Sequence, residues 1–93
     1  MIVACLRIQF HLPGCSSLKE KRFVLRSLKD RLRNRFNVAL CEIGYQDKWQ
    51  RSEIALVTVA GDRKGIDAAV QSILNFLERE ERAVMTECDR EFY

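Results

Sequence analysis

The sequence contains little proline or glycine, and it has no long hydrophobic run. One proline and four glycines among 93 residues exclude collagen-like and low-complexity chains. The longest apolar segments, such as residues 54–57, are far shorter than the roughly 20 residues that a membrane-spanning helix needs. Arg7 follows too soon after the first residue for a secretion signal. We therefore expect a soluble cytoplasmic protein with no membrane contact and one domain over residues 1–93.

The sequence also lacks the residue groups that metal binding or catalysis requires. Its four cysteines form no C-x-x-C pair, His11 is the only histidine, and no paired carboxylates or Ser/His/Asp set stands out. We expect Cys5, Cys15, Cys41 and Cys88 to be reduced and to act as small apolar side chains. The alternative is a reactive thiol at Cys15, with its pKa lowered by bases of the following helix. The prediction is a protein that is not an enzyme, with no catalytic residues, metal or cofactor.

The spacing of apolar residues predicts four strands and two helices. Residues 2–12 alternate between apolar and other side chains, and Pro13 and Gly14 end this strand. Ser17 and Glu20 form a capping box at the start of a helix, and Asp62 is a suitable N-cap for a second. The expected strands cover 2–12, 37–46, 53–61 and 83–92, and the expected helices cover 18–35 and 63–81. The apolar stripe of the first helix is expected at Leu18, Leu25, Leu28, Leu32 and Phe36.

The element order, βαββαβ, is that of the ferredoxin-like α+β fold. Right-handed crossovers would place both helices on one face of a four-stranded antiparallel sheet and leave the other face open. The open face of the first strand would then carry Val3, Cys5, Arg7, Gln9 and His11. A half-apolar open face is typical of a contact surface, and it predicts self-association as a homodimer.

Positive charge is concentrated in one segment. Residues 18–35 hold eight bases and two acids, a net charge of +6, and the remaining residues carry a net charge of −3. Helical spacing places five of the bases on one line about 21 Å long. We call this line the basic stripe; it consists of Lys19, Arg22, Arg26, Lys29 and Arg33. The stripe predicts a site for backbone phosphates of structured RNA. The alternative is a solvated helix face, partly paired with acids of the second helix or the last strand.

The expected loop between the second and third strands contains the only tryptophan of the chain, Trp49. An exposed loop tryptophan is typical of a partner contact or a stacking platform; the alternative is a ring that folds back over the hairpin or a dimer interface. The predicted partner-binding loop consists of Gln46, Asp47, Trp49, Gln50 and Arg51. The third strand carries no aromatic residue, which disfavours base stacking on the sheet in the manner of an RNA-recognition motif.

Four blocks of the sequence resemble the bacterial YlxP-like family of proteins of unknown function. They are residues 11–14 (HLPG), 17–22 (SLKEKR), 32–38 (LRNRFNV) and 46–51 (QDKWQR). The resemblance implies a ferredoxin-like fold. It also implies a role near translation or ribosome maturation, because genes of the family often lie beside those for translation initiation factor 2 and ribosome-binding factor A. Cys5, Cys15 and Cys41 do not belong to the family pattern.

The sequence therefore predicts a non-catalytic module that binds structured RNA or a ribosomal subunit. The basic stripe would hold phosphates, and Trp49 and Arg51 would add a second contact. The main alternative is a protein-interaction or oligomeric adaptor that uses the open sheet face and the Trp49 loop. A small-molecule sensor or an enzyme is a third alternative.

Overall fold

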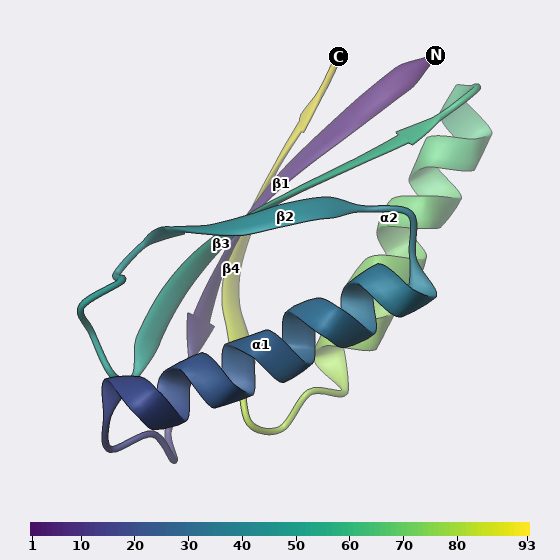
Figure 1. Cartoon of the computed structure of the whole chain (residues 1–93). Helices are drawn as coiled ribbons and strands as arrows, with labels where there is room; N and C mark the ends of the chain where they lie inside the picture. Colours follow the sequence, from purple (N-terminus) through teal and green to yellow (C-terminus); the bar gives the residue numbers. More distant parts are fainter.

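The computed structural model describes all residues from 1 to 93. Four strands and two helices follow one another in the predicted order (Figure 1). They are β1 (Ile2–His11), α1 (Leu18–Arg35), β2 (Ala39–Gly44), β3 (Arg51–Ala60), α2 (Arg63–Glu78) and β4 (Val84–Phe92).

The four strands form one antiparallel sheet in the order β2-β3-β1-β4. The two central strands, β1 and β3, pair without interruption from Ile2 opposite Ala60 to His11 opposite Arg51. Reciprocal backbone bonds of 2.8 Å join Val3 to Tyr93, so the two ends of the chain lie side by side (Figure 1). This architecture is the ferredoxin-like α+β fold, as predicted.

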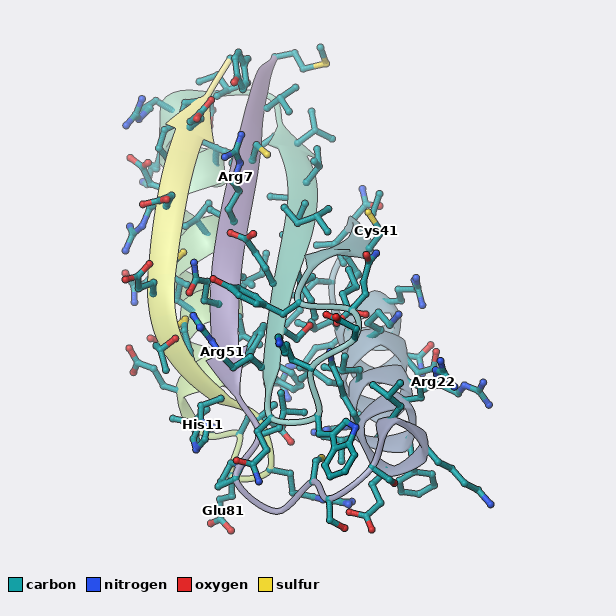
Figure 2. All side chains as sticks on the ribbon, turned by 90° about the vertical axis from the view of Figure 1, so that its left-hand side faces the viewer. Arg7, His11, Arg22, Cys41, Arg51 and Glu81 are labelled. Carbon is teal, nitrogen blue, oxygen red and sulfur yellow. The ribbon has the colours of Figure 1, made fainter.

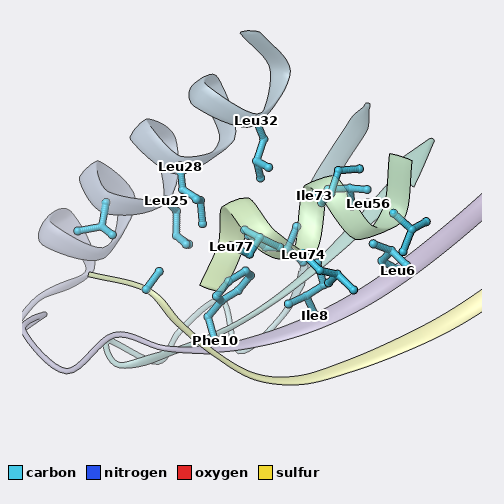
Figure 3. Packing of buried hydrophobic residues seen from close by; sticks show 14 of the residues in the cluster. Leu6, Ile8, Phe10, Leu25, Leu28, Leu32, Leu56, Ile73, Leu74 and Leu77 are labelled. Carbon is cyan, nitrogen blue, oxygen red and sulfur yellow. The ribbon is translucent and has the colours of Figure 1, made fainter. Parts of the chain in front are cut away.

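The core lies between one face of the sheet and the two helices (Figure 3). Alternation along β1 buries every second side chain from Ala4 to Phe10, because neighbouring residues of a strand point to opposite faces. The helices contribute leucines and isoleucines at spacings of three and four residues. The helical residues shown in Figure 3 include Leu25, Leu28, Leu32, Ile73, Leu74 and Leu77.

The end of α2 and the start of β3 differ from the boundaries expected from the sequence, and each difference has a local cause. Helix α2 ends at Glu78 rather than residue 81, and Glu80 leaves the helix to accept two hydrogen bonds from Arg31. Strand β3 begins two residues earlier than expected, because Arg51 still pairs with His11 across the sheet. Neither helix is long and apolar enough to cross a membrane.

The apolar stripe of α1 was predicted incompletely. Leu25, Leu28 and Leu32 are buried as expected, but Leu18 is only half-buried. Val24 and Lys21 take part in the buried face instead. Lys21 is therefore a lysine at a core position, with 1% of its surface exposed.

The Lys21 ammonium group is held by partners from the hairpin that joins β2 and β3. Its Nζ atom lies 3.0 Å from Glu42 Oε2 and donates a hydrogen bond of 2.5 Å to the carbonyl of Tyr45. Ser52, on β3, donates a hydrogen bond of 2.7 Å to the same carboxylate oxygen. A buried charge is tolerated only when it is paired and hydrogen-bonded. This network therefore ties α1 to both strands of the hairpin.

The hairpin leaves β2 through a constrained turn. Tyr45 has a φ of 58°, a left-handed conformation that is uncommon for a residue with a side chain. A Cβ added at Gly44, the residue before it, would lie 2.9 Å from Glu53 Oε1 and 3.2 Å from Glu53 Cβ, so a larger residue there would require the Glu53 side chain to move. The hydrogen bond from Lys21 to the Tyr45 carbonyl stabilises this turn from inside the protein.

We expect Lys21→Met to lower the free energy of unfolding by about 3 kcal/mol, the typical cost of removing one partner from a buried ion pair. The matched variant Lys21→Met/Glu42→Gln retains an acceptor for Ser52 but no longer carries an unpaired carboxylate. It should therefore lose less stability than the single variant. Urea denaturation followed by circular dichroism measures both. An unchanged midpoint for Lys21→Met would show that the network does not stabilise the fold.

Candidate nucleic-acid interface

The two exposed flanks of α1 face different parts of the molecule. One flank faces α2 and the segment after it, where Arg31 forms a bidentate pair with Glu80 at 2.7 and 2.9 Å. On the same flank, the Arg35 guanidinium lies 5.6 Å from the centre of the Phe76 ring. The opposite flank faces the edge strand β2. Helical geometry assigns most of the basic stripe to the β2 flank.

Four of the five residues of the stripe line one hollow of about 360 Å³ beside β2. Figure 2 shows one of them, Arg22, pointing away from the protein body on the side of α1. The remaining residue, Lys19, lines a different hollow, together with Phe23 and Arg82. The complete lining of the hollow beside β2 is Arg22, Leu25, Arg26, Lys29, Asp30, Arg33 and Glu42. We call it the basic hollow.

Most bases of the basic hollow have no acidic partner. Arg33 lies 3.7 Å from Asp30 and donates a hydrogen bond of 3.4 Å to the carbonyl of Leu40 on β2. Arg22, Arg26 and Lys29 form no ion pair. The second acid of the hollow, Glu42, is already paired with the buried Lys21. The hollow therefore has an excess of positive charge.

The acids of α2 and β4 do not pair with the stripe. The one base of α1 that pairs with the region around α2 is Arg31, which lies on the other flank. The expectation that acids of the second helix or the last strand pair with the basic stripe is therefore wrong. The reason is geometric: the two flanks are separated by the buried face of the helix.

The N-terminus of α1 is capped by its own side chains. Ser17 Oγ accepts the backbone N–H of Glu20 at 3.1 Å, as the capping box predicts. The return bond differs: the Glu20 carboxylate accepts from the backbone N–H and the hydroxyl of Ser16, rather than from Ser17. Both hydrogen bonds from Ser16 lower the pKa of the Glu20 carboxyl, and the backbone bond has the larger effect. A carboxylate thus already occupies this helix terminus.

All four cysteines are free, and Cys15 is buried in the core as a small apolar side chain, as expected. Cys15, the candidate reactive thiol, is buried, and desolvation together with the charge of Glu20 raises the pKa of its thiol despite nearby Arg82 and Lys21. The alternative, a reactive Cys15 thiol whose pKa is lowered by basic neighbours, is therefore wrong. Among the strand cysteines, Cys5 and Cys88 are half-buried and Cys41 is exposed (Figure 2).

The partner-binding loop lies at the hairpin end of the sheet. Trp49 is 54% exposed, so more than half of its surface is open to solvent. Asp47, Trp49, Gln50 and Arg51 line a hollow of about 500 Å³, which also includes His11 and Lys48. We call it the Trp49 hollow. Gln46 lies outside this lining and donates a weak hydrogen bond of 3.4 Å to the carbonyl of Glu42.

His11 and Lys48 also belong to this site, although the sequence pattern did not predict them as members. The antiparallel register places His11 directly opposite Arg51, and this pairing brings the end of β1 to the loop. The sequence could have placed His11 beside the loop only if the pairing register of β1 with β3 had been known.

Arg51 is already bound within the protein. Its guanidinium lies 4.0 Å from the centre of the Tyr45 ring. It also donates hydrogen bonds to the Tyr45 hydroxyl at 3.1 Å and to Gln9 Oε1 at 3.3 Å. Arg51 (labelled in Figure 2) thus links the Tyr45 side chain to Gln9, a residue on the open face of β1.

The rest of the open face is divided between apolar and acidic residues. Cross-strand register groups the apolar side chains toward the end that holds the chain termini. These are Val3, Cys5, Ala39, Cys41, Ala55, Val57 and Val59, which we call the apolar patch. Glu87, Asp89 and Glu91 of β4 face the same side, opposite Gln9, Arg7 and Cys5 of β1.

The apolar patch and Trp49 do not form one surface. Ala55, the patch residue nearest to the hairpin on β3, lies four residues from Arg51, a distance of about 13 Å at the rise of an extended strand, and Glu53 lies between them. The adaptor alternative therefore involves two separate surfaces. No group of three or more His, Cys, Asp or Glu residues is placed to hold a metal ion.

Comparisons with known proteins agree with the sequence resemblance. A family model described as "Protein of unknown function (DUF503)" matches residues 3–90. The chain is also similar to the protein named "Uncharacterized protein YlxP" of Bacillus subtilis strain 168. The two are 44% identical over 62 residues, which cover 67% of each chain. The matched residues include the basic stripe and the Trp49 hollow. The chain belongs to the DUF503 family.

Proposed function

We propose that this protein is a non-catalytic module of the cytoplasm that binds structured RNA or a ribosomal subunit, with a role linked to translation or ribosome maturation. Phosphates would contact the β2 flank of α1. The observation that carries the proposal is the basic hollow, where Arg22, Arg26 and Lys29 lie together without acidic partners. Such a cluster attracts a polyanion and releases its counterions on binding.

The residues of the open sheet face also favour α1 as the surface that contacts the RNA. The open sheet face carries Glu87, Asp89 and Glu91 along β4, and these acids repel phosphates. The exposed positions of β3 carry no aromatic side chain on which bases would stack. The α1 flank is therefore favoured over the sheet as the RNA-binding surface.

A second candidate function, self-association through the apolar patch, is favoured by one observation. Val57 and Val59 are 39% and 43% exposed in the middle of a sheet face that no helix covers. Contiguous apolar surface of this kind is typical of protein interfaces. The two functions are compatible, because the patch and the basic hollow lie on different sides of the sheet.

We expect Arg22→Gln/Arg26→Gln/Lys29→Gln to weaken binding to ribosomal subunits and to a structured RNA. The plot of log affinity against log salt should become less steep by about three, one for each phosphate contact removed. The matched control, Lys64→Gln/Arg79→Gln/Arg90→Gln, removes the same charge from outside α1. It should retain the original slope. Equal effects of the two variants, or no RNA binding by the native protein at low salt, would contradict the proposal.

For the second candidate, sedimentation at increasing concentration should reveal a homodimer that salt changes little. Val57→Lys places a charge in the apolar patch and should shift the protein to monomer. Trp49→Ala changes a residue of the hairpin loop, outside the patch, and should leave the dimer intact. A native protein that remains monomeric at high micromolar concentration would exclude this function.

A further inference from the structure

We propose that the Trp49 hollow binds an unpaired nucleobase of the RNA whose phosphates contact α1. The inference rests on the proposed function and specifies it, because it predicts a ligand with a single-stranded or bulged nucleotide rather than a continuous duplex. It assigns a binding role to His11 and Lys48, which neither the family description nor the basic stripe includes.

The hollow offers an aromatic surface that is open to solvent. Trp49 is 54% exposed on a loop, and its indole ring is a large flat surface for stacking. The His11 imidazole lines the same hollow, whose volume of about 500 Å³ is sufficient for a nucleobase and its sugar. Stacking on an exposed aromatic side chain is the usual way in which proteins bind unpaired bases.

The loop that carries Trp49 is held in place from both sides. Leu12 donates a backbone hydrogen bond of 2.9 Å to the carbonyl of Gln50, and Gln50 Nε2 donates one of 3.2 Å to the carbonyl of Cys15. At the other end of the loop, Lys21 binds the Tyr45 carbonyl. Because the loop is already ordered, binding does not incur the cost of fixing it. The exposed ring is a preorganised platform.

The polar groups of the hollow match the chemistry of a nucleotide. The side chains of Asp47 and Lys48 have no hydrogen-bond or ion-pair partner within the protein. The Asp47 carboxylate accepts hydrogen bonds, as the exocyclic amino group of a base requires, and the Lys48 ammonium suits a phosphate. His11 Nδ1 donates to the Gln50 carbonyl at 3.1 Å, so its Nε2 atom remains open to a ligand.

The position of the hollow relative to α1 allows one RNA to reach both sites. The loop lies against the start of α1 through Gln50 at Cys15 and Tyr45 at Lys21. Arg22, the first base of the basic hollow, directly follows Lys21 in the chain. A strand with its phosphates along the basic hollow can therefore place a neighbouring base against Trp49.

The experiment uses the native protein with two probes, a single-stranded 12-nucleotide RNA and an abasic strand of the same length. Trp49 is the only tryptophan, so intrinsic emission reports directly on this hollow. The RNA with bases should change the emission, whereas the abasic strand should bind without changing it. Trp49→Ala should weaken binding of the base-containing RNA about tenfold, the usual scale for one stacked base. It should leave the affinity for the abasic strand unchanged.

Two control variants separate this inference from the proposed function. Phe23→Ala removes an aromatic residue that is 65% exposed on α1 and should leave both affinities unchanged. Arg22→Gln/Arg26→Gln/Lys29→Gln should weaken both probes equally but retain the emission change at saturation. Salt-dependent binding with the same emission and the same Trp49→Ala effect for both probes would overturn the inference alone. No binding of either probe at low salt would also overturn the inference, whereas the proposed function is tested separately with ribosomal subunits and a structured RNA.

Discussion

The buried ammonium group of Lys21 is the constraint on which the arrangement of the candidate site depends. A charge at this depth must be neutralised where it lies, because transfer from water is costly. Glu42 and the carbonyl of Tyr45 meet this need, and both belong to the β2–β3 hairpin. The same contacts hold the hairpin loop beside the N-terminal turns of α1. The loop with Trp49 and the helix with the basic residues therefore have a fixed relative position.

The folded protein carries its acidic and its unpaired basic side chains on different surfaces. The acids of β4 lie on the open sheet face, Arg31 is neutralised on the α2 flank by Glu80, and Arg22, Arg26 and Lys29 remain free on the β2 flank. A net charge of only +3 for the whole chain conceals this separation. Long-range attraction of a polyanion depends on the local electric field rather than on the net charge of the whole chain. The β2 flank is therefore the candidate surface for RNA.

Several features of the structure were predictable from particular residues. The alternation from Ile2 to Leu12, the cap at Ser17 and the N-cap at Asp62 identified the first strand and the start of each helix. The site was predictable only in part. Four bases of the stripe do share one hollow, but Lys19 does not, and the burial of Cys15 rules out the reactive-thiol alternative. Burial depends on which segments pack over a residue, and spacing along the chain does not contain that information.

The sequence by itself determined the element order, the fold class and the presence of a basic helix, because periodicity, capping and charge spacing are local properties. It also determined the family, through four blocks of residues that resemble it. Tertiary structure decided the rest. It buried Lys21 against Glu42, joined His11 to the Trp49 loop through strand register, and placed the apolar patch and Trp49 toward opposite ends of the sheet. Each of these outcomes requires contacts between segments far apart in the chain, and such contacts are fixed only when the sheet and the two helices close on one core.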